Sequence, residues 1–494
     1  MIECAFSYFL TENITESKRI ISDLPVEKVF GKYKIRIDKE TPIFSAVKNS
    51  VECSIFGLAV DVISTANGEN LACQIVESCE TVQDLLKFEN QLGGKYILLF
   101  RNHDQYYIVG DATCSIPIYY DNEGDFVCSS NYQYIVNEKK YGVDREFAKI
   151  RASGDISQAM PYDITPYKQI KQLIPNHFLS IDDRRAVRFV NSTEKQARIS
   201  VEKATELVSP MIKNLLDFYK KQYKIYCPIT SGRDSRVVLA FLLESRENFT
   251  SYTIKHPEHN ENTQDITVPV ELCKQNDVEH RLVEDVVVTD ELRNEMDEML
   301  GSGSYSLRTL KIAQTIKEYF GDGAIINGDI IGQVGKCSLH RDIPSVFATP
   351  SYFRCKLHNY SRGAKTQLKR WLKDIKNSGE KVNTFDLFSV ENRLGRWAGQ
   401  ENLIYNTLGQ VYLNIFNCRS IIYVWTAVDR KQRKKSSIHI DLIGSSHGAL
   451  LDIPFERDES VLVKLSKSTG LAYLLSSYLK YYVEKIKHKK ERKL

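Results

Sequence analysis

The sequence lacks the features that mark a secreted, zinc-binding or membrane-spanning protein. None of its 11 cysteines stands in a Cys-x-x-Cys pair, and their number is odd, which argues against a disulfide framework or a zinc site. No apolar run approaches the roughly 20 residues that cross a bilayer. The start, Met1-Ile2-Glu3-Cys4, has no basic segment followed by a long apolar stretch, as a signal peptide would. We therefore expect reduced thiols, a cytoplasmic location and no membrane partner.

The sequence also has no strong excess of charge of either sign. The 67 Lys and Arg residues against 63 Asp and Glu leave a net charge of +4, too little to argue for a nucleic-acid partner. The basic run Lys485–Lys493 is typical of a solvated helix end or frayed tail, with nucleic-acid or membrane binding as the lesser alternative. A length of 494 residues predicts two or three domains.

The first 190 residues have the rhythm of a mainly β domain. Short apolar runs separated by turn residues predict strands, and they lie at Ser54–Val60, Tyr96–Phe100, Tyr106–Val109, Ile116–Tyr120 and Phe126–Ser129. Helices are predicted near Thr81–Gln91 and Asp144–Ala152. This pattern indicates a layered α+β domain with antiparallel sheets.

The rhythm changes after a polar linker at Asn191–Arg198 and a helix at Val201–Tyr219. Helix-length segments then alternate with buried strands, at Lys224–Ile229, Phe249–Ile254, Val278–Val283 and Gly323–Ile326. Such alternation predicts an α/β domain with a parallel sheet, whose ligands bind at the carboxyl ends of the strands. Beyond Gly363 the chain is expected to be mainly helical, and we find no internal repeat.

The most informative segment lies at one of these strand ends. Thr230-Ser231-Gly232-Arg233-Asp234-Ser235 follows a predicted buried strand and opens a predicted helix. Unpaired N–H groups at a helix start attract anions, the hydroxyls add donors, and a carboxylate can hold magnesium between phosphate oxygens. The segment therefore predicts a polyphosphate site. The alternative is a plain turn in which Asp234 or Ser235 caps the helix.

This loop resembles the Ser-Gly-Gly-x-Asp-Ser pyrophosphate loop of the N-type ATP pyrophosphatases, and the whole chain resembles the asparagine synthetase family. Several further segments follow in that family's order: Leu92–Leu99, Gly110–Thr113, Pro117–Tyr120, Ser129-Ser130, Asp163–Tyr167, Ile170–His177, Gly328-Asp329 and Asp452–Phe455. The resemblance implies a class II glutamine amidotransferase-like domain over 1–190, of the Ntn-hydrolase type. It implies an ATP pyrophosphatase domain over 200–494, of the adenine nucleotide alpha hydrolase type, with a helical extension.

Two departures from the family pattern stand out. Glutamine-using members have a cysteine nucleophile directly after the initiator Met, where this chain has Ile2, and Cys4 is better explained as a buried structural thiol. The first domain is thus expected not to release ammonia. In the second domain, Gln333 stands where a glutamate is expected and Asp329 keeps one carboxylate, which puts magnesium handling and turnover in question.

The resemblance implies ATP and Mg²⁺ as cofactors and assigns roles to individual residues. Asp234, Arg236 and Arg433 would be catalytic, and Asp234 with Asp329 would share magnesium. The nucleotide and its pyrophosphate would be bound by Thr230, Ser231, Gly232, Arg233, Asp234, Ser235, Ile254, Gly328 and Gln333. The adenylate would be steadied by one or more of the later cations Arg393, Arg396, Arg430, Lys431 and Arg433, while His439 and His447 are expected to have ordinary polar or surface roles.

The reaction so implied is ATP-dependent, AMP-forming amide ligation without glutamine. A small-molecule or peptide carboxylate would be adenylated and then attacked by an amine, in the tailoring of natural products, peptides or surface polysaccharides. The alternative is a catalytically impaired nucleotide-binding scaffold in a biosynthetic complex, and a weaker third is tRNA modification. A homodimer or a biosynthetic partner protein is compatible with either of the first two.

Overall fold

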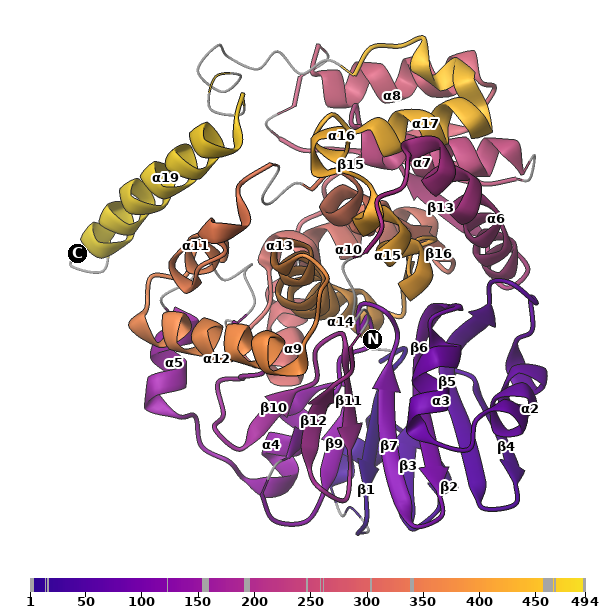
Figure 1. The fold of residues 1–494 in the computed structure, drawn as a ribbon, viewed down its shortest axis with the longest axis vertical. Helices are drawn as coiled ribbons and strands as arrows, with labels where there is room; N and C mark the ends of the chain where they lie inside the picture. Colours follow the sequence, from indigo (N-terminus) through magenta and orange to yellow (C-terminus); the bar gives the residue numbers. More distant parts are fainter. Residues whose placement is uncertain are drawn as a thin grey trace.

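A computed structural model shows two halves stacked on one another, with the first half at the bottom of Figure 1 and the second above it. The structure describes all residues except 1–3, 14, 16, 122, 153–159, 191–195, 246–247, 258, 261, 303, 338–341, 456–464, 466–467 and 492–494. Ile2 and most of the predicted linker therefore lie outside the described residues.

The first half is built on two six-stranded antiparallel sheets. One sheet has the order β10 (Ile170–Gln172), β8 (Tyr119–Asp121), β9 (Val127–Ser129), β1 (Tyr8–Thr11), β3 (Tyr33–Ile37) and β2 (Val26–Phe30). The other has the order β12 (Arg185–Arg188), β11 (His177–Ser180), β7 (Gln105–Gly110), β6 (Leu92–Asn102), β5 (Val51–Asp61) and β4 (Ile43–Lys48). Both sheets confirm the antiparallel α+β class.

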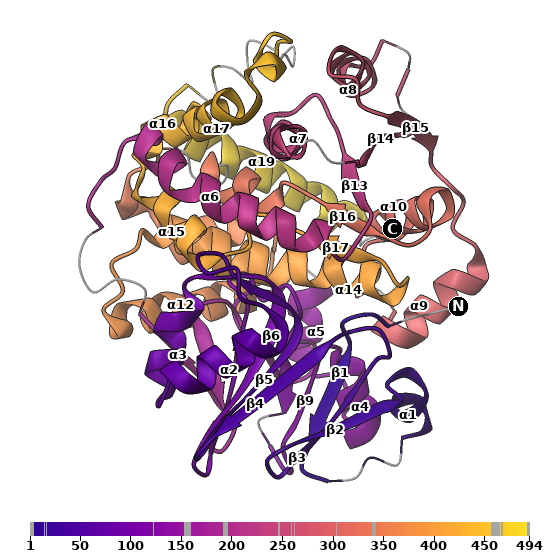
Figure 2. The same ribbon diagram turned by 90° about the vertical axis from the view of Figure 1, so that its right-hand side faces the viewer.

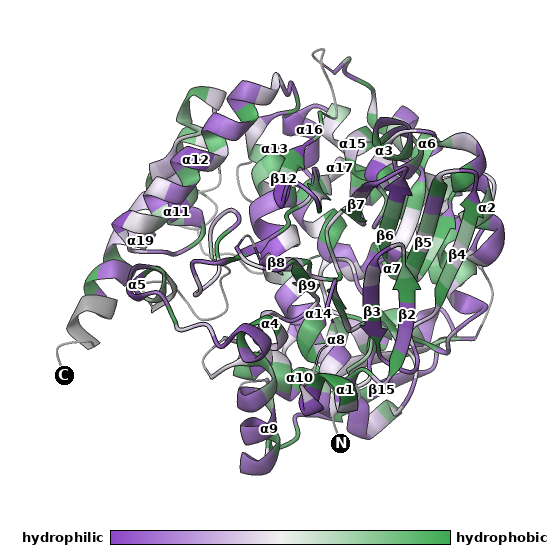
Figure 3. Ribbon diagram, turned by 90° about the horizontal axis from the view of Figure 1, so that it is seen from below, coloured by the Kyte–Doolittle hydropathy of each residue, from purple (hydrophilic) through white to green (hydrophobic). Residues whose placement is uncertain are grey.

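The two sheets pack face to face because their long strands are apolar on both faces. Phe56 and Leu58 of β5 join the core between the sheets, whereas Ile55 of the same strand packs under the outer helices. This is the two-residue alternation that the pleat imposes. Helices α2 (Gly68–Ser78) and α3 (Val82–Glu89) cover one outer face, and α1 (Lys18–Asp23) and α4 (Tyr132–Lys139) cover the other. Figure 3 shows β5 and β6 largely hydrophobic and the peripheral α12 (Arg362–Ser378) largely hydrophilic.

The second half contains the parallel sheet. Its five strands run in the order β15 (His280–Glu284), β14 (Thr250–Lys255), β13 (Ile225–Pro228), β16 (Ala324–Ile326) and β17 (Val411–Leu413), with every pairing parallel. Strand order reverses at β13, because β14 and β15 lie on one side of it and β16 and β17 on the other. A ligand crevice forms at such a switch point, outside the carboxyl ends of the strands.

Helices surround this sheet and form the region that separates it from the first half (Figure 2). Those next to the sheet are α6 (Val201–Lys220), α7 (Arg233–Glu244), α8 (Gln264–Gln275), α9 (Asp290–Leu300), α10 (Leu307–Phe320), α14 (Gly399–Thr407), α15 (Arg419–Ala427), α16 (Arg430–Lys434) and α17 (Ser437–His447). The remainder are α5 (Arg145–Ala152), α11 (Pro350–Lys356), α12, α13 (Thr384–Phe388), α19 (Gly470–Glu491), the π-helices η1 (Ile331–Gly335) and η3 (Ser389–Ala398), and the 3₁₀ turns η2 (Ser345–Phe347) and η4 (Gly448–Leu451). No described helix is long and apolar enough to cross a membrane.

Buried polar contacts join the two halves. Arg188 of β12 forms two 2.7 Å hydrogen bonds with Glu391 of η3, and Arg419 of α15 lies 2.6 Å from Glu89 of α3. Lys95 of β6 is buried, and its Nζ donates to Asn406 Oδ1 at 2.7 Å. Breaking one partner of a buried ion pair costs several kcal/mol, so the first half is firmly placed against the second.

Each predicted strand and helix overlaps an observed one, but several observed elements were not predicted. In the first half these are β1 to β4, β10 to β12, α1, α2 and α4; β2 and β4 are largely solvent-exposed and lack an unbroken apolar run, and several of the others are only three or four residues long. The expected strand Ile116–Tyr120 begins only at Tyr119. Strand β17 interrupts the region expected to be helical, since three residues are too few for a periodic signal.

Candidate functional site

The loop Thr230–Ser235 lies at the switch point of the parallel sheet. It follows the central strand β13 and leads into α7, whose N-cap residue is Gly232 and whose first turn has no side-chain cap. Side-chain oxygens usually occupy this position and bind the first N–H groups. The start of α7 therefore has the partial positive charge and the uncapped backbone donors that an anion requires.

Hydroxyl groups hold the loop in shape. The Ser235 hydroxyl accepts from the backbone N–H of Thr230 at 3.2 Å, and the Thr230 hydroxyl accepts from Gly232 N–H at 3.2 Å. Thr230 is solvent-exposed, and Gly232, Asp234 and Ser235 are half-buried. The loop is thus preorganised and open to solvent on one side.

A carboxylate from the next helix already occupies one donor position. Asp265, in the first turn of α8, accepts from both the backbone N–H of Ser231, at 3.0 Å, and its hydroxyl. Ser231 is buried, so this part of the loop faces protein and not solvent. Thr230, Gly232 and Ser235 are the loop residues left open to an incoming phosphate, and the phosphate-binding role of Ser231 stays a prediction that would require Asp265 to give up its hydrogen bonds.

Asp234 is held between two basic side chains. Its Oδ2 lies 2.6 Å from Lys336 Nζ, and its Oδ1 lies 2.9 Å from Nε2 of the buried His439. Burial alone would raise the pKa of Asp234, but the contacts with His439 and Lys336 outweigh it and lower the pKa to about 2. Burial lowers the pKa of His439, so the ring is neutral at pH 7 and donates its Nε2 proton to an ionised Asp234.

Two glycines allow this packing. A Cβ added to Gly332 in η1 would lie 2.7 Å from Asp234 Oδ2, and one added to Gly328 would lie 2.8 Å from the Asp234 backbone carbonyl oxygen. Both distances are shorter than van der Waals contact, so any side chain would push the two segments apart. The segment after β16 therefore lies against the start of α7, and the nucleotide-binding role of Gly328 stays a prediction.

A second acidic group lies at the ends of the next two strands. Asp329, just after β16, accepts from the Tyr412 hydroxyl of β17 at 3.1 Å, and burial raises its pKa to about 6. Glu401 of α14 accepts from the Thr309 hydroxyl at 2.9 Å, and burial, reinforced by the charge of Asp329, raises its pKa to about 7. Glu401 is thus half-protonated near neutral pH, which suits a proton acceptor.

The carboxylates of Asp234 and Asp329 do not fit the role of ligands to a magnesium ion held between them. Both oxygens of Asp234 are already bonded to cationic or N–H donors, and Asp329 accepts a hydrogen bond from the Tyr412 hydroxyl in a buried position. Nowhere in the described part of the chain do three His, Cys, Asp or Glu side chains converge as a metal site would require. The positive charge expected from a metal is supplied at Asp234 by Lys336.

The predicted arginines are placed around the loop in supporting positions. Arg236 is buried, and its guanidinium donates to the carbonyl oxygens of Leu450, Pro454 and Ile453. The ring of Phe455 lies over Arg236, with 4.3 Å between the guanidinium carbon and the ring centroid. Arg236 therefore ties the C-terminal segment to α7, and its donors point at backbone carbonyls.

Arg433 is held in a buried ion pair. Its two terminal nitrogens each lie 2.8 Å from an oxygen of Asp386, and one of them also donates to the carbonyl oxygen of Val334 in η1, at 3.1 Å. Its side chain is 1 % exposed, so Arg433 positions η1 from behind. The catalytic roles predicted for Arg236 and Arg433 remain predictions.

The other predicted residues are spread more widely. Gln333 is half-buried in η1, and Ile254 is half-buried at the end of β14. Arg396 is buried against the carbonyl oxygens of Met160 and Ile164, away from the loop contacts described above. His447 lies 2.7 Å from Asn276, the ordinary polar role expected of it, whereas His439 belongs to the site.

The thiol of Cys4 is not a nucleophile in this fold. Its side chain is 3 % exposed, and burial, together with the charge of Asp23, raises its pKa to about 12. A thiolate is the reactive form, so the interpretation of Cys4 as a buried structural thiol is confirmed.

Four residues of the site were not predicted as such from the sequence: Lys336, His439, Glu401 and Tyr412. They lie 102, 205, 167 and 178 residues after Asp234 respectively, and none belongs to a spacing that predicts a site. Lys336 was quoted only as the last residue of the Gly-rich segment. Only the fold brings these four side chains to the same strand ends.

Comparisons with known proteins identify no family for this chain. No family model matches it, and no curated protein matches it. The solved structures that match this chain include glutamine phosphoribosylpyrophosphate (PRPP) amidotransferase from B. subtilis, complexed with ADP and GMP. That match has 11% identity over 74% of this chain and 73% of the other, with a TM-score of 0.24. NMN synthetase from Francisella tularensis matches at 12% identity over 53% of this chain and 100% of that one, with a TM-score of 0.20. Likeness at this level carries no argument about fold or function.

Proposed function

We propose that this protein is an ATP-dependent, AMP-forming ligase that joins a carboxylate to an amine without using glutamine. The observation that carries the proposal is the uncapped start of α7 at the switch point of the sheet, with Lys336 2.6 Å from Asp234. Backbone N–H groups, hydroxyls and an ammonium meet there on a solvent-accessible loop. That combination suits the leaving pyrophosphate of a nucleotide.

In the first step, an oxygen of the substrate carboxylate attacks the α-phosphorus of ATP, and the bond to the β-phosphate bridging oxygen breaks. Pyrophosphate leaves with that electron pair, held by the hydroxyls of Thr230 and Ser235, the N–H groups at the start of α7, and Lys336. The loop is already ordered by its own hydrogen bonds, so little reorganisation is needed when negative charge develops. Magnesium would accompany the nucleotide as its counterion and would not depend on a protein cage.

In the second step, an amine nitrogen attacks the acyl carbon, and AMP leaves as the amide forms. The nitrogen must lose a proton, and we assign Glu401 as its acceptor because its pKa of about 7 matches that task. Asp329 sits beside it and keeps that pKa high. Arg236 and Arg433 act as positioning residues for α7 and η1.

The first half supplies a wall of the site. Lys95 and Thr113 of that half and Asp329 and Tyr412 of the second half line a small cavity of about 30 Å³. Together with the inert thiol of Cys4, this favours an amine taken from solution over ammonia made internally. Small-molecule or peptide substrates, with a cytoplasmic role in natural-product, peptide or surface-polysaccharide synthesis, fit this proposal.

A second function is favoured by one observation. Asp265 occupies the donors of Ser231, and a carboxylate next to the loop repels phosphate oxygens. A homologue that binds nucleotide weakly and acts as a scaffold in a biosynthetic complex would tolerate this arrangement, whereas an efficient ligase would have to overcome it.

ATP–pyrophosphate exchange in the presence of candidate acids separates the two functions. The ligase predicts acid-dependent exchange that is lost in Asp234→Ala and kept in Asp217→Ala, a matched change at an exposed aspartate of α6. Nucleotide binding without exchange across a broad acid panel would support the scaffold. A protein that binds no nucleotide at all would contradict both the ligase and the scaffold function.

A further inference from the structure

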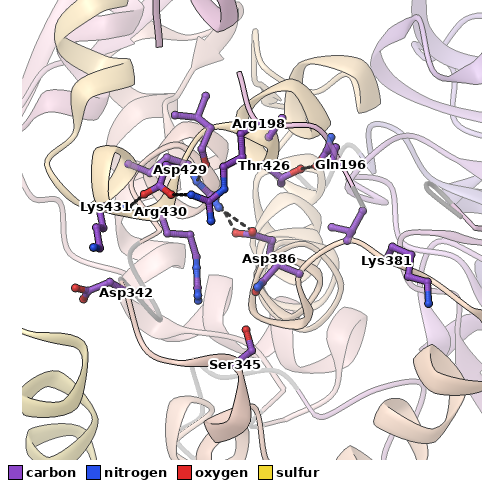
Figure 4. Close-up of a pocket in the computed structure, with 15 residues that line it drawn as sticks. Gln196, Arg198, Asp342, Ser345, Lys381, Asp386, Thr426, Asp429, Arg430 and Lys431 are labelled. Carbon is purple, nitrogen blue, oxygen red and sulfur yellow. Dashed lines mark hydrogen bonds and ion pairs between the residues drawn. The ribbon is translucent and has the colours of Figure 1, made fainter. Parts of the chain in front are cut away.

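A second pocket lies behind η1, apart from the loop. It has a volume of about 350 Å³ and is formed by α13, α16, the end of α15 and the last residues of the linker (Figure 4). Arg433 lines this pocket and also donates a hydrogen bond to the carbonyl oxygen of Val334 in η1. The volume is in the range of small-molecule sites.

Every acidic side chain of the pocket is already neutralised by a basic partner. Asp386 pairs with Arg433 at 2.8 Å, and Asp429 pairs with Arg198. Asp342 lies 3.3 Å from Lys434 Nζ. The carboxylates therefore contribute little net negative potential to the pocket.

Three cations of the pocket have no such partner. Lys381, Arg430 and Lys431 form no ion pair with any described residue. In Figure 4, Arg430 points between Asp342 and Ser345, while Lys431 and Lys381 lie on opposite sides of the pocket. Arg430 is fixed by a 2.8 Å hydrogen bond from Nη1 to the carbonyl oxygen of Ile343, which leaves its remaining N–H donors for a ligand. The pocket thus presents three uncompensated positive charges from three directions.

We infer that this pocket binds a small molecule carrying two or more negative charges on phosphate or carboxylate groups. A guanidinium suits either group through paired hydrogen bonds, and lysine ammonium groups act as point charges. The nearby Ser345 hydroxyl is placed to add a neutral donor. The inference does not rest on the proposed ligase, since none of the three cations contacts the loop.

Chemical footprinting of lysines tests this site directly. The protein is labelled with an amine-acylating ester, with and without tripolyphosphate or citrate, and the modified lysines are quantified by mass spectrometry. We expect labelling of Lys381 and Lys431 to fall several-fold with at least one probe, while labelling of the exposed Lys87 stays unchanged. The probe that protects better tells whether phosphate or carboxylate is preferred. Equal labelling of Lys381 and Lys431 with and without both probes would overturn the inference.

Variants separate this pocket from the nucleotide loop, which can itself bind tripolyphosphate. Because each removed ammonium takes away part of the attraction for an anion, Lys381→Gln combined with Lys431→Gln should weaken probe binding about fivefold or more in titration calorimetry. Lys435→Gln, an exposed lysine just after the same helix, is the matched control. Lys336→Met removes the loop's ammonium and should leave protection of Lys381 and Lys431 intact. If Lys336→Met abolishes the protection of Lys381 and Lys431, and the double variant binds the probe as tightly as wild type in titration calorimetry, the anion site is the loop and not this pocket.

Discussion

Removal of the Lys336 ammonium is the sharpest perturbation of the loop. In Lys336→Met the apolar stem is kept, but the charge 2.6 Å from Asp234 Oδ2 is lost. The pKa of Asp234 is about 2 against an ordinary 3.8, and one pKa unit corresponds to about 1.4 kcal/mol. Since Asp234 is 33% exposed, solvent screening reduces the joint contribution of Lys336 and His439 to about 1–2 kcal/mol.

The sign of the pH dependence follows from the lowered pKa. Stability from an aspartate whose pKa is depressed is present above the unfolded pKa of about 4 and is lost as pH falls through the folded value of about 2. Urea unfolding should therefore show Lys336→Met less stable than wild type by about 1 kcal/mol at pH 7, with a smaller difference at pH 3. In this variant the buried ring of His439 keeps its contact with Asp234 while the ammonium is lost, so the pKa of Asp234 should rise.

Nucleotide binding should respond more strongly than stability. A hydrogen bond to a charged group contributes about 1.5–3 kcal/mol, so losing the ammonium should raise the Kd for ATP about 10- to 100-fold. Lys336→Arg keeps the charge and should lose much less, and Lys435→Met is the surface control. Titration calorimetry measures all three. ATP affinity that is unchanged in Lys336→Met would refute the role assigned to this residue.

Three further changes probe the same site. Gly332→Ala places a Cβ 2.7 Å from Asp234 Oδ2 and should lower the free energy of unfolding by about 1–3 kcal/mol, measured by thermal unfolding. The control Gly142→Ala, whose added Cβ meets nothing within 4 Å, should change it little. Equal losses in the two variants would contradict the packing argument. Asp265→Asn removes the carboxylate from Ser231 and should tighten ATP binding in calorimetry; weaker binding would show that Asp265 assists the site. Glu401→Gln should abolish amide formation while leaving ATP–pyrophosphate exchange. The rate of amide formation by the wild type should rise with pH through about 7. A pH-independent rate of amide formation would exclude Glu401 as the base. Because its pKa is raised, Glu401 lowers wild-type stability as pH rises from about 4.5 to 7, so the variant should be the more stable protein at pH 8.

The fold class could be predicted from the sequence because it depends on the periodicity of apolar residues. Alternating apolar runs predicted the antiparallel half, and strands separated by helix-length segments predicted the parallel sheet. The short edge strand β17, which carries Tyr412, escaped prediction, since three residues leave no period to detect. The predicted strand, turn and helix around Thr230–Ser235 placed the loop at the end of β13, where the structure has it.

Only some residues of the site could be predicted from the sequence. The loop is local in sequence, so its hydroxyls and Asp234 could be named in advance. The partners of Asp234 come from segments about 100 and 200 residues away, and their contact depends on how η1 and α17 pack. The magnesium ion shared by Asp234 and Asp329 stays a prediction, because a carboxylate can be recognised in a sequence but the ammonium of Lys336 next to Asp234 cannot be placed without the fold.

The central claim is that the start of α7 binds the phosphates of a nucleotide. A crystal structure with a non-hydrolysable ATP analogue tests it most directly. The account predicts phosphate oxygens within hydrogen-bonding distance of the Thr230 and Ser235 hydroxyls and of Lys336 Nζ. A nucleotide bound elsewhere, with Lys336 still paired to Asp234 and the loop unchanged, would contradict it.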